Sequence, residues 1–141
     1  MAGGAFRLRG EGQRELLHVA DETWIAAPPE RVGAAVAVTA RWERFWPGLH
    51  PRLVEGRGEQ GVRVAVDEQG GGHGWHGTAE LYLRPEFEGT LLFHFLRLDP
   101  APGRRVGARA ARAEQHRLSA AGLAAAWALK DELEGRTPAG G

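Results

Sequence analysis

The segment over residues 104–134 constrains the fold more than any other part of the chain. It contains no proline and consists mostly of alanine, arginine, leucine and glutamate, which have high helix propensity. Gly135 follows it as a natural C-terminal stop. The segment predicts one long helix whose packing face carries Leu118, Gly122, Ala125, Ala126, Leu129 and Leu133, flanked by Leu123 and Trp127. A helix with one such face needs a partner surface, which the preceding strands must supply.

Two runs of strand-forming residues precede this helix. They read WHGTAELYLRP and TLLFHFLRLDP, and a short turn near residues 86–89 separates them, so they predict a β-hairpin. A turn centred near Phe87 would give an apolar face beneath the helix, with the pairs Ala79–Phe95, Leu81–Phe93 and Leu83–Leu91. The other face would then hold the pairs Glu80–His94 and Tyr82–Leu92.

The N-terminal half predicts a strand, two short helices and two more strands. Residues 15–27 place β-branched and aromatic residues at near-alternate positions, ending at Pro28 and Pro29. A first helix follows, with Glu30 near its positive end and Val32, Ala35 and Val36 at helical spacing. Thr39 is expected to cap a second helical piece, ARWERFW, which Pro47 stops. Strands around residues 51–56 and 62–68 bring the expected total to five.

Length and composition predict a single domain over residues 15–135, with flexible tails at 1–14 and 136–141. The 18 basic and 18 acidic residues balance, so no overall field favours a nucleic-acid partner. The chain has no cysteine, which excludes disulfides and thiolate metal sites. No apolar run approaches the roughly 20 residues of a membrane span, so we expect a cytoplasmic protein without integral membrane association. The oligomeric state stays open, a homodimer included.

Four stretches carry a resemblance to a known superfamily. TWIAAPPERVGAAV with RWERFWPGL, and AELYLRPEFEGTLLFHFLRLDP with AWALKDELEGR, together look like the opening and the closing parts of the START-like polyketide cyclase/dehydrase (SRPBCC) superfamily. The resemblance implies an α+β helix-grip fold: a curved antiparallel sheet, two short helices after the first strand, and a long C-terminal helix packed over the sheet. It also implies a cavity between sheet and helix that holds an apolar molecule.

Three functions follow from this resemblance by analogy. The first is binding or carriage of an apolar small molecule, polyketide-like or lipid-like. The second is a cyclase or dehydratase, a lyase-like enzyme without metal or nucleotide cofactor, that uses one acid/base residue from Asp21, Glu22, His18 and His94. The third is a regulatory module whose cavity is vestigial. We expect the first of these functions, non-enzymatic binding of an apolar small molecule.

The chain departs from the superfamily pattern in two respects. Relatives usually have six or seven strands, whereas five can be counted here. Many relatives also carry a tryptophan in the first helix at the position of Gly33. The missing indole could leave room for a ligand, or Trp42 or Trp46 could fill its place.

The expected ligand site lies between the apolar face of the hairpin and the small residues of the long helix. Aromatic residues line apolar pockets and fill ordinary cores alike, so both roles stay open for them. The residues assigned to this site are Trp42, Trp46, Trp75, Leu81, Phe93, Phe95, Gly122, Ala125 and Trp127.

The titratable residues give weaker signals. His73 and His76 lie close together in sequence, but a metal site needs three or more convergent ligands, so surface histidines, no metal and no cofactor are expected. The predicted Glu80–His94 pair can be an acid/base pair or an ordinary ion pair outside the sheet. Asp21 and Glu22 are adjacent in a strand, so a regular strand would turn one of them inward. An irregular or exposed strand explains the same pair.

Overall fold

The protein is described by a computed structural model over residues 17–67 and 74–135. The expected tails at 1–14 and 136–141, and His73, lie outside this part. The architecture is α+β, as predicted. Its elements in chain order are β1 (Leu17–Ile25), α1 (Pro29–Val36), η2 (Thr39–Arg41), α2 (Trp42–Phe45), β2 (Arg52–Gly56), η3 (Gly58–Gln60), β3 (Gly61–Val66), β4 (Trp75–Glu86), β5 (Gly89–Pro100) and α3 (Ala108–Leu133).

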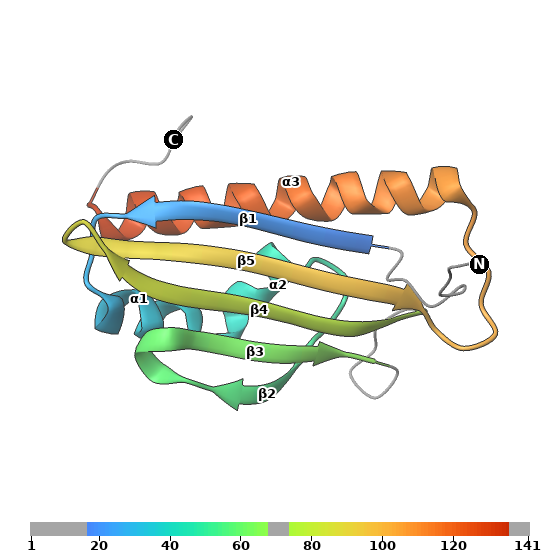
Figure 1. Cartoon of the computed structure of the whole chain (residues 1–141), viewed down its shortest axis with the longest axis horizontal. Coiled ribbons are helices and arrows are strands. Elements are labelled where there is room, and N and C mark those ends of the chain that lie inside the picture. Colours follow the sequence, from blue (N-terminus) through green and yellow to red (C-terminus); the bar gives the residue numbers. More distant parts are fainter. Residues whose placement is uncertain (1–16, 68–73, 136–141) are drawn as a thin grey trace, which may run out of the picture.

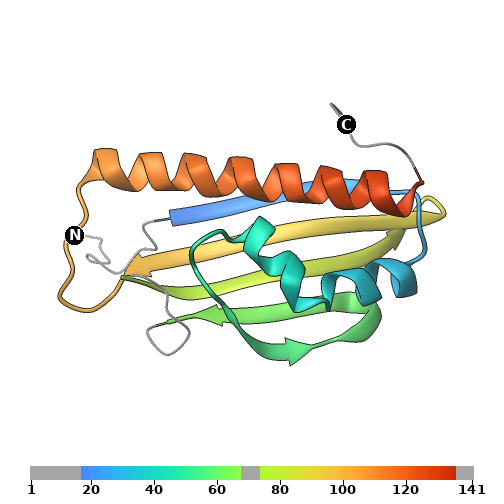
Figure 2. The same ribbon diagram turned by 180° about the vertical axis from the view of Figure 1, so that it is seen from behind.

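The described strands form one five-stranded antiparallel sheet in the order β1-β5-β4-β3-β2. All the helices lie on one face of this sheet, with α3 along β1 and with α1 and α2 over the remaining strands (Figures 1 and 2). The opposite face carries no helix in the part of the chain that is drawn in colour. This is a two-layer arrangement in which the core lies between sheet and helices.

Alternation along the strands determines which side chains enter the core. On β3, Val62, Val64 and Val66 are buried while Arg63 is exposed, as expected for a strand with one face exposed to solvent. The remaining buried strand residues on the inner face include Leu17, Val19, Ile25, Ala79, Leu81, Leu83, Leu92, Leu96 and Leu98. Phe45, Trp46 and Leu49 close the core from the helical layer.

The β4–β5 hairpin exists, but its predicted register is wrong by one residue. Glu86 pairs with Gly89, so the turn consists of only Phe87 and Glu88. Both turn residues have positive φ, 51° and 60°, as a two-residue type I′ turn requires. The sequence lacks the Asn-Gly or Asp-Gly that marks such turns. It therefore contains no local signal for a two-residue turn at this point.

A one-residue shift moves every side chain of the second strand to the other face. Leu81 lies opposite His94, Leu83 opposite Leu92 and Ala79 opposite Leu96. Leu81 and Leu83 are buried, as predicted. Leu91, Phe93 and Phe95 instead lie on the outer face, half-buried, and His94 enters the core.

The helix α3 starts later than predicted and covers the edge of the sheet. It begins at Ala108, after Gly107 in an extended conformation. Its side chains bond the backbone groups of edge strand β1: the Gln115 side-chain oxygen accepts from the His18 amide at 3.1 Å, and Lys130 Nζ donates to the Trp24 carbonyl at 2.7 Å. These contacts block the strand edge against pairing with another chain. Among the described residues, no helix is both long enough and apolar enough to cross a membrane.

Two expectations for the first helices are corrected. Thr39 is the first residue of η2 and makes no capping side-chain bond; Val38 occupies the cap position. Gly33 leaves no room for a ligand, because a Cβ there would overlap the carbonyl oxygen of Gly58. The glycine is needed for the close approach of η3 to α1.

Candidate functional site

His94 lies at the centre of the interface between sheet and helices. Its side chain is 2% exposed. The indole Nε1 of Trp46 donates a hydrogen bond to His94 Nε2 over 2.9 Å, and the rings of Phe45 and Trp46 lie 5.8 and 6.0 Å away between centroids. Burial lowers the pKa of His94 from 6.5 to about 4, because desolvation disfavours the charged imidazolium. The imidazole is therefore neutral at pH 7.

The bond from Trp46 fixes the tautomer of this neutral ring. An indole nitrogen can only donate, so His94 Nε2 must accept and the proton must be on Nδ1. No protein group described in the structure bonds Nδ1, although the atom is buried. His94 thus presents an unpaired N–H donor to the core.

Asp21 is the cross-strand neighbour of His94 in the β1–β5 pairing. The sequence left open whether Asp21 or Glu22 points inward; Asp21 does, while Glu22 is exposed. Within the described residues, Asp21 Oδ2 is buried without a hydrogen-bond partner. A buried donor and a buried acceptor, both unpaired, therefore come from directly opposed positions of two strands. We call them the Asp21–His94 pair.

Gly122 of α3 lies directly over the His94 ring. A Cβ at residue 122 would overlap Nδ1 and Cε1 of the His94 ring. The helix can lie directly on the imidazole only because residue 122 has no side chain. Ala125 and Ala126 follow one turn later and are also buried, so the inner face of α3 is made of small residues along this stretch.

A hollow of about 310 Å³ opens at the end of the molecule where α3 begins. Leu49, Trp75, Val106 and Ala110 supply its apolar lining, and Arg104, Glu114 and Arg117 its polar lining. Arg104 lies over the Trp75 ring at 4.9 Å and bonds the carbonyl of Gly74. Arg117 pairs with Glu114, which lowers the pKa of that carboxyl through their hydrogen bond. We call this hollow the mouth.

The mouth and the Asp21–His94 pair lie along the same helix. Ala110 lines the mouth and Gly122 covers His94, which places them about 18 Å apart along α3 at the α-helical rise. Trp46, which bonds His94, is followed directly by Pro47, Gly48 and Leu49, and the last two line the mouth. Leu118, one helical turn before Gly122, and Phe45, whose ring lies 5.8 Å from that of His94, are both fully buried.

The structure separates the predicted ligand residues into three groups. Leu81, Trp42 and Trp46 are buried in the core, and Gly122 and Ala125 are buried on the inner face of α3. Trp75 is buried at the mouth. Trp127 is 50% exposed beside Lys130, and Phe93 and Phe95 face away from α3.

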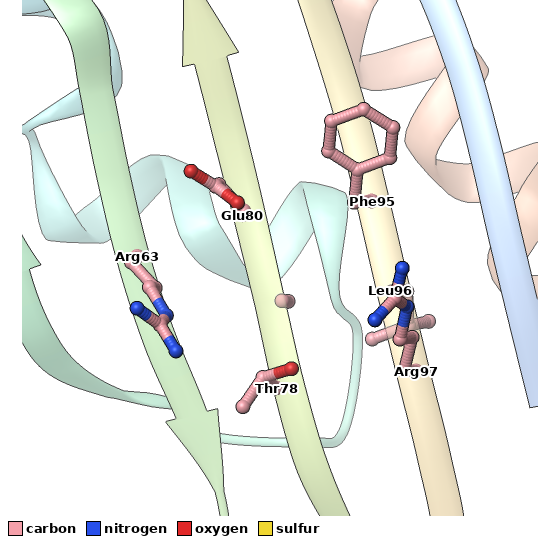
Figure 3. A pocket seen from close by; sticks show the side chains of 7 residues that line it. Arg63, Thr78, Glu80, Phe95, Leu96 and Arg97 are labelled. Atoms are coloured by element: carbon pink, nitrogen blue, oxygen red, sulfur yellow. The ribbon is translucent and has the colours of Figure 1, made fainter. Parts of the chain in front are cut away.

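The outer face forms a different hollow of about 260 Å³ around Phe95. Figure 3 shows the Phe95 ring and Arg97 on β5, with Thr78 on β4 and Arg63 on β3. Glu80, predicted to pair with His94, lies here instead, opposite Phe95, and forms an ion pair with Arg57. The predicted Glu80–His94 pair is therefore wrong, because the register shift turned these two side chains to opposite faces.

Among the described residues, no group of three or more histidine, aspartate or glutamate side chains is placed to hold a metal ion. His76 is exposed on β4, and His73 lies outside the described part. The sequence did not predict that Asp21, Trp46 and His94 come together.

Comparison with solved structures places this architecture among known folds. The solution structure of Bacillus halodurans protein BH1534 matches 86% of this chain and 99% of its own, with a TM-score of 0.55 and 12% identity. The chain has the helix-grip fold. The Aha1 dimer from Colwellia psychrerythraea matches over 84% and 96% of the two chains, with a TM-score of 0.52 and 14% identity.

A third match is to the di-domain aromatase/cyclase StfQ from the steffimycin biosynthetic pathway. Its TM-score is 0.48 and its identity 18%, over 89% of this chain and 55% of that one. The sequence matches no protein-family model and no curated protein. At these identities the likeness concerns the helix-grip fold, which is the fold expected from the resemblance to the START-like superfamily.

Proposed function

We propose that this helix-grip chain binds a mainly apolar small molecule between α3 and the inner face of the sheet, with the Asp21–His94 pair as its polar anchor. The observation that carries the proposal is the unpaired state of two complementary polar atoms at opposed positions of β1 and β5, whereas the buried Thr90 hydroxyl donates to the Ala27 carbonyl. A buried polar atom without a partner costs about 1–3 kcal/mol. A ligand that bonds both atoms recovers this cost, so the pair favours the bound state.

The chemistry of the pair selects the polar group of the ligand. His94 Nδ1 carries a proton and can only donate, whereas the Asp21 carboxylate can only accept. One hydroxyl group satisfies both, since its oxygen accepts from Nδ1 and its hydrogen goes to Oδ2. A phenol or an alcohol on an apolar skeleton is therefore the ligand class that fits.

Access requires α3 to move away from the sheet, because the helix rests on the His94 ring. On the inner face of α3, Gly122, Ala125 and Ala126 bury less apolar area than the flanking Leu118 and Leu129. Because burial contributes about 25 cal/mol per Å², α3 separates from the sheet at the lowest cost over residues 122–126. The mouth lies at the end of α3 where the ligand enters. Trp75 and Leu49 offer it a first apolar contact.

An acid/base enzyme of the cyclase or dehydratase type is the second candidate. The observation that favours it is the adjacency of Asp21 and His94, two of the four acid/base candidates. His94 is poorly placed for the role, however, because its only lone pair accepts from Trp46 and its pKa of about 4 leaves it neutral near pH 7. Asp21 alone remains as a base. The arrangement thus fits binding better than proton transfer.

The test is a titration with 1-naphthol, an apolar molecule with one hydroxyl, followed through tryptophan fluorescence. Ala125→Trp should abolish binding because residue 125 faces the core. Ala124→Trp is the matched control, since residue 124 is exposed on the same helix, and should bind as the parent does. Native mass spectrometry of the purified protein would reveal a co-purifying ligand. Equal binding in both variants, or none in the parent, would overturn the proposal and leave the vestigial module.

A further inference from the structure

The outer face of the sheet carries a row of aromatic side chains on β4 and β5. The centroids of the Tyr82 and Phe93 rings lie 5.9 Å apart, and those of Phe93 and Phe95 also lie 5.9 Å apart, with only 7° between the two ring planes. All three side chains are half-buried, and no helix of the described part covers them (Figures 1 and 2). The row therefore offers aromatic surface to a molecule from solution.

The hollow of about 260 Å³ around Phe95 lies at the end of this row. Its polar lining includes Arg63 of β3, Thr78 of β4 and Arg97 of β5. Figure 3 shows these side chains on neighbouring strands, with the Phe95 ring seen face-on. Glu80 is the only carboxylate that lines the hollow within the described part of the chain. We call this space the outer hollow.

Arg63 lacks an acidic partner because Arg57 binds the carboxylates next to it. The strand pairing places Arg63 opposite Glu55 of β2 and opposite Glu80 of β4. Both carboxylates form ion pairs with Arg57 instead. Within residues 17–67 and 74–135, no carboxylate pairs with Arg63. The charge of Glu80 is thereby offset while that of Arg63 is not, so the outer hollow attracts an anion.

We infer that the outer hollow binds a small planar aromatic molecule that carries a carboxylate or a phosphate. The oxyanion pairs with Arg63, since a guanidinium bonds such groups through two parallel N–H donors. The ring of the ligand stacks on Phe95 in an offset arrangement, which aromatic pairs prefer. An apolar cavity of roughly 150 Å³ already suffices to hold a benzene ring, so the outer hollow has room for the ring and its anionic group.

Thr78 and Arg97 complete the polar side of the site. They lie directly opposite one another across β4 and β5, on the same face as Arg63. The Thr78 hydroxyl can donate to an oxyanion, and a guanidinium has five N–H donors, so Arg97 can bond a ligand in addition to its other partners. This set of donors favours an anion over a neutral molecule or a cation.

Charge on the rest of this face favours a small molecule over a strand of nucleic acid. Glu22 lies opposite Phe93, and Asp99 follows two residues after Arg97, so both side chains share the outer face. A polyanion that followed the aromatic row would meet these carboxylates, whereas a ligand with one anionic group at Arg63 avoids them. The inference does not rest on the proposed function, because Phe95 and His94 lie on opposite faces of β5.

Calorimetric titration with 2-naphthoate and with 2-naphthyl phosphate tests the inference. The parent should bind at least one of them at one site per chain, and the neutral 2-naphthamide far more weakly. Arg63→Gln should weaken binding of the anion by about tenfold or more, as expected for the loss of hydrogen bonds to a charged group. Arg112→Gln is the matched control, because it removes the same charge from an exposed position on α3, and should bind as the parent does. No saturable binding in the parent, or an equal effect of both substitutions, would overturn the inference.

Two further comparisons separate the outer hollow from the proposed inner site. Ala125→Trp should lose 1-naphthol but keep the aromatic anion, and Arg63→Gln should do the reverse, so either site can fail without the other. In ¹H–¹⁵N NMR spectra of the parent, which need no variant, the amide signals of Thr78 and Phe95 should shift with the anion, and that of Ala126 should not. Loss of the anion in Ala125→Trp, shifts confined to α3, or tighter binding of a single-stranded thymidine oligonucleotide than of either probe would contradict the inference.

Discussion

The indole nitrogen of Trp46 donates to Nε2 of His94 over 2.9 Å, and this contact decides what the histidine can do. It uses the single lone pair of the neutral ring and leaves the proton on Nδ1, which faces the core unpaired. His94, which the sequence offers as a candidate acid/base residue, is thereby a buried hydrogen-bond donor. The consequences can be measured as stability, as packing and as ligand preference.

Stability should depend on pH through His94. Its pKa is about 4 in the folded protein and near 6.5 when unfolded, so the unfolded state binds more protons between these values. The free energy of unfolding should therefore fall as the pH drops from about 6.5 to about 4, by about 3 kcal/mol from this residue. Urea denaturation of the parent and of His94→Gln at pH 7 and pH 4 measures it. An equal pH dependence in both proteins would show that His94 is not the source.

Gly122→Ala should destabilise the protein although alanine favours helix by about 1 kcal/mol. The added Cβ overlaps the His94 ring, and overpacking of this kind costs about 1–3 kcal/mol. A double-mutant cycle with His94→Ala, measured by chemical denaturation, should recover most of the loss. If Gly122→Ala stabilises the parent, α3 does not rest on His94.

The register of the hairpin is tested by a pair of truncations on neighbouring residues. Leu96 is fully buried on the inner face, so Leu96→Ala should lower the free energy of unfolding by about 2–5 kcal/mol. Phe95 lies half-buried on the outer face, and Phe95→Ala should cost about 1 kcal/mol. The reverse order of the two denaturation midpoints would restore the register expected from a turn centred on Phe87.

The sequence was sufficient for the elements and their order. A proline-free helical stretch, two strand-like runs and paired prolines after the first strand are local signals, and they correctly predicted α3, the hairpin and the strand followed by short helices. The count of five strands also follows from such signals. Each depends on residues close together in the chain, where propensity and periodicity act.

The register of the hairpin was predicted wrongly because both faces of β5 look apolar in the sequence. Leu91, Phe93 and Phe95 alternate with Leu92, His94 and Leu96, so either set could face the core. The decisive residues lie further along: the second set continues with Leu98, while the first meets Arg97. Extending the alternation by two residues would have favoured the observed register and placed His94 inside.

The Asp21–His94 pair could be predicted only in part. The alternation of Leu17, Val19, Thr23 and Ile25 shows that Asp21 shares their face. Its partner depended on the register of β5 and on the pairing of β1 with β5, which joins residues distant in sequence. Trp46 and Gly122 meet His94 through tertiary packing alone, and no spacing in the sequence brings them together.

A ¹⁵N NMR spectrum of the His94 imidazole at pH 7, with and without 1-naphthol, tests the Asp21–His94 anchor most directly. We expect a neutral ring protonated at Nδ1, with an Nδ1 resonance that shifts when 1-naphthol binds and shifts far less with 1-methylnaphthalene, which lacks the hydroxyl. A ring protonated at Nε2, or an Nδ1 resonance unchanged at saturation with 1-naphthol, would contradict it.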